Sequence, residues 1–277
     1  MKSRFLPLTA LLAVGMLVAT TATTAGASDA RVRVLHASPD APAVDVYLDG
    51  AKVLGDVPFG TISDYLNVPA GDHEVKVFAA GTTTGAVIDT TLTLAAGTSY
   101  TVAATNALAS IEAQVFVDDP TPTADMAQLR AVHLSADAPA VDVAPRGSAV
   151  SAAVVTNLAY PNATGYLTLS PGSYQLDVRL AGTTTVALAL PTLDLAAGTS
   201  YSAFVIGSAA SPAVGGNGLT AVLAVDGTAS SMPNTSTGAP ATNTGLLAGT
   251  LLLFAAALLA MGQVVRRPLT RRVRSRD

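Results

Sequence analysis

The chain has 277 residues, a formal net charge of −4 and no cysteine. The lack of cysteine excludes disulfide bonds, thiolate catalysis and Cys-ligated zinc. Residues 28–244 hold seven Lys or Arg against eighteen Asp or Glu, a net charge of −11. Such an acidic region argues against nucleic-acid binding, which requires clustered basic residues.

The first 27 residues have the pattern of a secretory signal peptide. Lys2 and Arg4 give a positive start, an apolar run covers residues 6–19, and small residues end in Ala25-Gly26-Ala27. The apolar run is shorter than a membrane-spanning helix requires. We therefore expect export and cleavage after Ala27, with an uncleaved N-terminal anchor as the alternative.

Two stretches of the chain occur twice. Residues 33–46 (RVLHASPDAPAVDV) return as residues 130–143 (RAVHLSADAPAVDV), and Leu94–Tyr100 returns as Leu195–Tyr201. The offset grows from 97 to 101 residues, which predicts a four-residue loop insertion in the second copy, between Asp142 and Tyr160. A period of about 100 residues is too long for a solenoid repeat and fits two whole domains in tandem.

This repetition predicts the organisation of the whole chain. The expected parts are a signal peptide (1–27), a first domain (28–118), a linker (119–128), a second domain (129–227), a stalk (228–245), a transmembrane helix (246–265) and a basic tail (266–277). Each domain has the size of an independently folding unit.

The first copy alternates apolar and polar residues with a period of two, which indicates β-strands. Asp49-Gly50 lies between two such runs and predicts a tight hairpin turn. Short antiparallel strands in such number are typical of immunoglobulin-like β-sandwiches, so we expect an all-β chain with two tandem immunoglobulin-like antiparallel β-sandwich domains. The strands expected in the first copy cover residues 32–36, 44–48, 62–68, 73–78, 87–94, 99–103 and 111–117.

Each copy also places a tyrosine just after a glycine turn. Tyr100 follows Gly97, and Tyr201 follows Gly198. This arrangement resembles the tyrosine corner of immunoglobulin-like domains, in which the hydroxyl bonds to the backbone upstream. We expect both tyrosines to have a structural role.

A polar constellation lies in both copies of the repeated stretch. A Ser-His-Asp hydrolase is one reading, although all members lie within ten residues and no G-x-S-x-G elbow is present. A zinc or calcium site is a second reading, with one His and two carboxylates from each copy as ligands. The residues concerned are His36, Ser38, Asp40 and Asp45, which recur as His133, Ser135, Asp137 and Asp142.

The third reading of these residues is structural, and it is the one we favour. Asp40-Ala-Pro42 forms a turn because Asp bonds to the backbone two residues on and Pro fixes φ. His36 then lies at a strand end and supplies a ring N–H to a loop carbonyl or to an Asp. Asp45 and Asp142 alternate with valines, which predicts that both lie on the outer face of a strand.

The same residues carry a resemblance to a known family. The pattern His36-x-Ser38-x-Asp40-Ala-Pro42-x-Val44-Asp45-Val46, followed by Gly60, Tyr65 and a Pro-x-Gly turn, resembles the DUF4397 family. The resemblance covers both copies, roughly residues 31–117 and 129–225. It implies secreted or surface-anchored bacterial β-domains, often in tandem, and it brings no catalytic residues because the family has no assigned activity.

The C-terminal part has the pattern of a membrane anchor. Residues 246–265 form an apolar stretch long enough to span a bilayer. Arginines follow it, and basic residues beside a span stay in the cytoplasm, so everything before the span is expected outside. The arginines are Arg266, Arg267, Arg271, Arg272, Arg274 and Arg276.

The stalk that precedes this span is rich in Ser, Thr, Pro and Gly and is expected to be flexible. Met232-Pro233-Asn234-Thr235 resembles a degenerate cell-wall sorting motif, with Met in place of Leu and Ser236 in place of Gly. Two outcomes stay open: sortase linkage to the wall, or retention by the transmembrane helix, which we favour.

Together these features predict a non-enzymatic protein of the bacterial cell surface, anchored with its N-terminus outside. It would present two β-sandwiches for adhesion, envelope structure or ligand binding, with an extracellular protein or glycan as partner, the membrane as anchor, no nucleic acid and no cofactor. The alternative is an extracytoplasmic metal-dependent sensor or a hydrolase that uses the repeated His-x-Ser-x-Asp loop.

Overall fold

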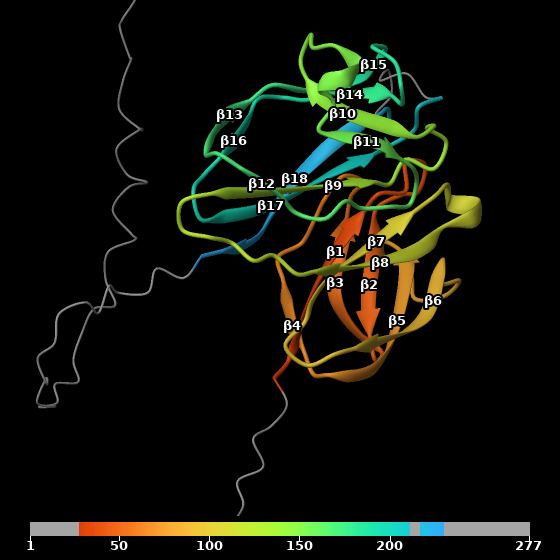
Figure 1. The fold of residues 1–277 in the computed structure, drawn as a ribbon. Coiled ribbons are helices and arrows are strands. Elements are labelled where there is room, and N and C mark those ends of the chain that lie inside the picture. The colour runs from red at the N-terminus through yellow and green to blue at the C-terminus, as the bar shows by residue number, and fades with distance from the viewer. Residues whose placement is uncertain (1–27, 211–216, 230–277) are drawn as a thin grey trace, which may run out of the picture. The chain divides into compact units, whose positions relative to one another are not determined.

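The computed structural model describes residues 28–210 and 217–229, all of which belong to one compact unit, Met1–Ser231 (Figure 1). The expected signal peptide, sorting motif, transmembrane helix and basic tail lie outside the described residues. Within the described ranges, no helix has the length and apolar character needed to cross a membrane.

The first repeat is a β-sandwich of two four-stranded sheets. One sheet has the order β4-β1-β7-β8 and the other β3-β2-β5-β6. All pairings are antiparallel except that of β1 with β7, which is parallel. The strands are β1 (Ala30–His36), β2 (Val44–Leu48), β3 (Ala51–Val57), β4 (Leu66–Val68), β5 (Gly71–Ala79), β6 (Ile88–Leu94), β7 (Ser99–Thr105) and β8 (Glu112–Asp118), with a short 3-10 helix η1 (Leu108–Ser110) before β8.

The second repeat has the same plan. Its sheets have the orders β12-β9-β17-β18 and β11-β10-β14-β15, and β13 pairs with β16 in a separate two-stranded ladder. The pair β9–β17 is parallel, like β1–β7. The elements are β9 (Ala127–His133), β10 (Val141–Pro145), η2 (Val150–Ala152), β11 (Val155–Leu158), β12 (Leu167–Leu169), β13 (Gly172–Tyr174), β14 (Leu176–Leu180), β15 (Val186–Ala189), β16 (Leu193–Leu195), β17 (Thr199–Ile206) and β18 (Thr220–Thr228). The expectation of an all-β fold is therefore confirmed for residues 28–210 and 217–229.

Some expected boundaries differ from the observed ones. The strand expected over 62–68 is reduced to β4, preceded by an isolated bridge between Ile62 and Leu35. Strand β3 was not expected, because its residues are mostly exposed and Gly55 interrupts them. The chain between β8 and β9 covers residues 119–126, so β9 begins inside the expected linker.

The turns follow the sequence closely. Asp49 and Gly50 both have positive φ, 50° and 80°, as the tight hairpin between β2 and β3 requires. In the second copy the corresponding connection, between β10 and β11, is longer and contains η2. The predicted insertion therefore lies in this hairpin loop.

The two corner tyrosines bond as expected. The backbone N–H of Ala95 donates to the Tyr100 hydroxyl, and that of Ala196 donates to the Tyr201 hydroxyl, both at 3.1 Å. Each bond fixes the turn that precedes a central strand, β7 or β17. The structural role predicted for both tyrosines is confirmed.

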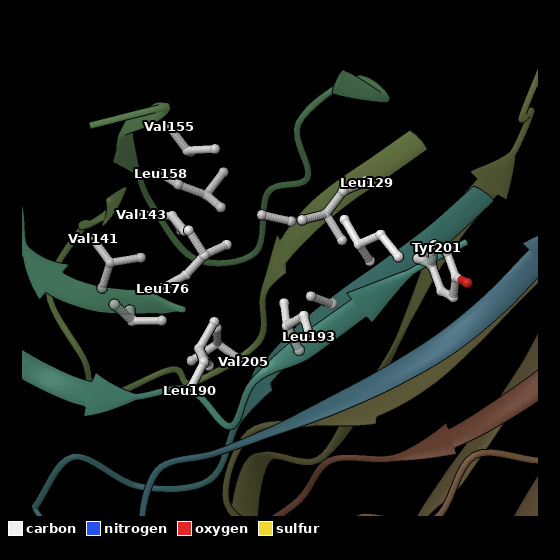
Figure 2. Close-up of a cluster of buried hydrophobic side chains, with 14 of the residues drawn as sticks. Leu129, Val141, Val143, Val155, Leu158, Leu176, Leu190, Leu193, Tyr201 and Val205 are labelled. Carbon is white, nitrogen blue, oxygen red and sulfur yellow. The ribbon is translucent and has the colours of Figure 1, made fainter. Parts of the chain in front are cut away.

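Each sandwich encloses its own apolar core. In the second repeat the inward residues of β9 and β17 meet those of β10 and β14, as Figure 2 shows for Leu129, Val143, Leu176 and Val205. In the first repeat, valines of β2 and β5 pack with Ile88 and Ala104. Alternation along each strand sends every second residue into these cores.

A further apolar cluster joins the two repeats. It contains Leu35, Ala37 and Ala103 from the first repeat together with Val132, Leu134, Phe204 and Ile206 from the second. Ala37 and Leu134 directly follow β1 and β9, and the others lie on the faces of β1, β7, β9 and β17 that point away from the sandwich cores. One face of each sandwich is therefore buried against the other repeat.

Candidate functional site

The histidine of each repeated motif lies at the end of a central strand and is fully buried. The Nε2 of His36 lies 3.0 Å from the carbonyl oxygen of Pro42, and its Nδ1 faces the backbone N–H of Ser38 at 3.4 Å. His133 makes the same two contacts, with Pro139 at 3.1 Å and with the N–H of Ser135 at 3.3 Å.

These contacts define the protonation of the ring. A carbonyl can only accept and a backbone N–H can only donate, so Nε2 carries the proton and Nδ1 is the acceptor. Burial lowers the pKa of both His36 and His133. The hydrogen bond to the proline carbonyl raises the pKa, but this effect is smaller. Each imidazole is neutral and connects two parts of the motif loop. Its ring N–H donates to a loop carbonyl, as the structural reading of the motif expected.

The first aspartate of the motif ties its loop to a neighbouring loop. Asp40 accepts the backbone N–H of Leu108, in η1, at 2.7 Å. Asp137 accepts the Ser208 hydroxyl at 2.6 Å and the N–H groups of Ala209 and Ala210 at 2.9 and 3.0 Å. Both aspartates therefore hold the segment that follows the central strand β7 or β17.

The Asp137 carboxyl is kept ionised by these bonds. Partial burial raises its pKa, but the hydrogen bonds from Ser208, Ala209, Ala210 and Ser135 outweigh that effect and lower the pKa to about 2. A carboxylate that accepts several N–H and O–H groups is stabilised in its charged form.

The two serines behave differently. The Oγ of Ser135 donates to Asp137 at 3.1 Å. The Oγ of Ser38 is buried and has no hydrogen-bond partner among the described residues. Neither hydroxyl bonds to the histidine of its own motif, so the described contacts do not form the Ser-His pair that a nucleophile requires.

The second aspartate of the motif lies on the outer strand face, as expected, because its valine neighbours Val44 and Val46 point into the core, but this face is covered. Asp45 and Asp142 are only 2% and 4% exposed. Asp45 accepts the N–H groups of Asp56 and Gly81 at 2.8 and 3.1 Å, and Lys52 Nζ at 2.8 Å. The hydrogen bond from Lys52, followed by the two backbone bonds, lowers the Asp45 pKa to about 2.

Asp142 has the corresponding backbone partners in the second copy, Asn157 at 2.7 Å and Gly182 at 2.8 Å. All four partner residues have left-handed backbone: φ is 53° at both Asp56 in β3 and Asn157 in β11, and it is 78° at Gly81 and 72° at Gly182, in the turns after β5 and β14. A carboxylate that accepts one N–H group from the neighbouring strand and one from a turn anchors both of them. The alternation with valines gives the correct strand face but does not show that a strand and a turn cover the aspartate there.

The six candidate metal ligands are thus bonded to separate parts of the fold. His36 bonds to Pro42, Asp40 to η1, and Asp45 to strand β3 and the turn after β5. Over residues 28–210 and 217–229, no three His, Asp or Glu side chains come together in a group that could hold a metal ion. The motif residues build loop connections within each copy.

A cleft of about 450 Å³ lies where the two motif loops meet. Pro39 and Asp40 of the first copy line it together with Ala136 and Asp137 of the second. Leu134 of the second copy also lines it. The remaining lining residues come from the segments that the two aspartates hold, and from the chain before β18: Asn106, Ala107, Ser110, Gly207, Ser208 and Asn217. Both copies of the most specific motif of the sequence therefore line one cleft.

Motif reasoning missed a second set of polar residues, which is buried between the repeats. Arg33 of β1 donates to Asp226 of β18, and Arg130 of β9 donates to Asp118 of β8. Each arginine also lies over a tyrosine ring, with Cζ 4.7 Å from the Tyr65 centroid and 5.0 Å from that of Tyr166. A signal was present, because both arginines open the repeated 14-residue stretch.

Comparison with known proteins gives one family. The family model described as "Domain of unknown function (DUF4397)" matches residues 30–144 and 148–244. No curated protein matches the chain. A solved structure described as a "putative cell adhesion protein" from Bacteroides eggerthii aligns with 12% identity over 72% of this chain and 96% of that chain, with a TM-score of 0.19. That similarity is too low to support any argument about function. The two family matches cover most of the chain, which therefore belongs to the DUF4397 family.

Proposed function

We propose that the protein is a non-enzymatic, cell-surface-anchored protein whose two joined β-sandwiches present the inter-repeat cleft to an extracellular protein or glycan. The observation that carries this proposal is that both copies of the most specific motif form the walls of one cleft. Loops on a rigid β-scaffold are the usual place of recognition, and clefts between domains are the usual place of ligands.

The hydrogen bonds of the motif histidines favour a binding role over a hydrolytic one. His36 and His133 use both ring nitrogens within their own loops. A general base must be within reach of the proton that it removes, and these two rings are fully buried. Each sandwich is proposed to be immunoglobulin-like, with support from its two sheets and its tyrosine–backbone bond.

The direction of β18 supports a surface role. This strand begins beside the cleft, near Asn217, and runs for nine residues to Thr228. At about 3.3 Å per residue it carries the chain roughly 30 Å away from the cleft. The chain then continues toward the expected stalk and anchor, so the cleft lies at the end of the unit remote from that exit.

Anchoring is tested with the full chain, tagged after Ala27 and expressed in a Gram-positive host. Antibody should label intact cells, and deletion of residues 246–265 should release the protein into the medium. Tag that becomes accessible only after lysis would contradict surface anchoring.

Binding is tested on immobilised extracellular-matrix proteins and glycans, with cells that carry the same chain. Ala136→Trp fills the cleft from an exposed position, and Ala189→Trp on β15 is the matched control. Adhesion to a member of the panel should be lost with Ala136→Trp and retained with the control. Adhesion that is equal in both variants would exclude the cleft as the binding site.

A further inference from the structure

The polar contacts between the repeats are reciprocal. Arg33 donates to Asp226, to the carbonyl of Val225 at 3.1 Å, and to Thr101 of its own repeat at 2.8 Å. Arg130 makes the equivalent contacts, with Asp118, with the carbonyl of Val117 at 2.9 Å and with Ser202 at 2.9 Å. Each repeat thus offers one arginine to the other and receives one in return.

Each aspartate of this set is also fixed from within its own repeat. Asp118 accepts the hydroxyls of Tyr65 at 2.7 Å and Thr101 at 2.6 Å. Asp226 accepts those of Tyr166 at 2.7 Å and Ser202 at 2.6 Å. Both repeats therefore hold a carboxylate in place, ready for the arginine of the other.

The face of each repeat that carries these arginines and aspartates is buried against the other repeat. The side chains of Arg33, Arg130, Asp118 and Asp226 are at most 4% exposed. A repeat without the other would expose its part of the apolar cluster and would lose the charged group that the other repeat supplies, although Arg33 would keep Asp118 of its own repeat at 3.5 Å. Such exposure is unfavourable.

The covalent tie between the two repeats is short. It covers residues 119–126, which include Pro120 and Pro122. The contacts described above depend on a first repeat meeting a second repeat, and none of them depends on both belonging to one chain. Exchange of identical elements between copies through a hinge segment is a low-cost route to dimers.

We propose that two copies of this chain exchange repeats, so that the first repeat of each copy packs on the second repeat of the other. The resulting dimer contains the crossed Arg–Asp set twice. Each of its clefts is then built by two chains, with Asp40 from one copy and Asp137 from the other. This partnership is independent of the ligand proposed for the cleft and of the membrane anchor.

Complementary charge reversal tests the exchange. In fragment 28–231, which contains all the residues that the structure describes, Arg33→Asp opposes Asp226 with a like charge, and Asp226→Arg opposes Arg33. Neither variant can satisfy its own interface. When the two are refolded together, the reversed pair forms in one interface of an exchanged heterodimer and the natural pair in the other.

The expected result is a 1:1 heterodimer of the two variants, seen by light scattering and native mass spectrometry. The double variant R33D/D226R restores the pair within one chain, is the matched control, and should not require a second chain for folding. Absence of heterodimer after joint refolding would overturn the proposal.

The unaltered sequence provides a second measurement that does not depend on the folding of variants. Isotope-labelled and unlabelled fragment 28–231 are unfolded together and refolded at high and at low concentration. Exchange predicts dimers with mixed labels at high concentration and monomers at low concentration. Monomers at every concentration would overturn the proposal.

Discussion

The guanidinium of Arg33, in the first strand of the first repeat, is paired with the carboxylate of Asp226, in the last strand of the second repeat. Both side chains are fully buried. This pair, with its counterpart Arg130–Asp118, connects the two sandwiches through charge as well as apolar contact.

Removal of one member should be strongly destabilising. Arg33→Ala leaves Asp226 buried without its main partner, which typically costs about 3–5 kcal/mol. Urea unfolding of fragment 28–231 measures the loss. Arg31→Ala is the matched control, because Arg31 is exposed and bonds to Ser99 on the same sheet, and it should cost less than about 1 kcal/mol. Equal losses in both variants would contradict the buried pairing.

Each motif histidine should stabilise its own repeat. His36→Ala or His133→Ala removes a buried ring and leaves a proline carbonyl and a serine N–H without their bonds. We expect a loss of about 2–4 kcal/mol for each. Thermal unfolding with EDTA, Ca²⁺ or Zn²⁺ should give the same midpoint for the natural sequence. A rise of the midpoint with metal that disappears in the histidine variants would favour the metal reading instead.

Acid should weaken the fold through the same residues. Burial lowers the folded-state pKa of His36 and His133 below the ordinary histidine value of 6.5, so the unfolded chain binds more protons at low pH. Their contribution to stability is therefore complete above about pH 6.5 and is lost as the pH falls below it. Urea unfolding between pH 8 and pH 5 should show this fall, and the double histidine variant should show a smaller one. An identical slope in both proteins would contradict the neutral buried ring.

His73 should act in the opposite direction. Its hydrogen bond to Asp49, at 2.7 Å, is the main cause of a raised pKa, with a smaller contribution from the carbonyl of Pro69. The stability that it adds is complete below about pH 6.5 and is lost as the pH rises through its folded-state pKa. His73→Gln should remove part of the decrease above neutral pH and leave the acid side unchanged. If His73→Gln changed the stability at acid pH and left the stability above neutral pH unaltered, this assignment would be wrong.

The hydrogen bonds of the corner tyrosines can be tested by removing only the hydroxyl oxygen of each side chain. Tyr100→Phe and Tyr201→Phe each leave a backbone N–H without its acceptor, at Ala95 and Ala196. We expect a loss of about 1–2 kcal/mol for each in thermal unfolding. Tyr174→Phe, which removes an exposed bond to the Ser170 carbonyl, should cost less than about 0.5 kcal/mol. A control as costly as the corner variants would show that the loss is not specific to the corners.

The sequence predicts the class of the fold and most of its turns because these depend on local rules. Alternating valines mark β2 and β5, and the Asp49-Gly50 pair marks the hairpin. These rules do not predict strand β3, because it is exposed and lacks a clear alternation. They do not predict the burial of Asp45, because it depends on a strand residue and a turn residue that lie 11 and 36 positions further along the chain.

The cleft could be anticipated only in part. Repetition of the motif identifies the loops around Asp40 and Asp137, but not that they meet. Their meeting depends on contacts between residues about 190 positions apart, such as Arg33 with Val225 and Asp226. No local pattern in one sequence encodes such a pairing, although the recurrence of the arginine indicates a shared role.

The two repeats form one unit through the buried face that carries Arg33 and Arg130. Scanning calorimetry of fragment 28–231 and of its Val178→Ala variant, altered in the core of the second repeat, distinguishes one cooperative unit from two. A single transition, with calorimetric and van't Hoff enthalpies equal and shifted as a whole by the variant, is the expected result. Two separate transitions, of which only one responds to Val178→Ala, would contradict it.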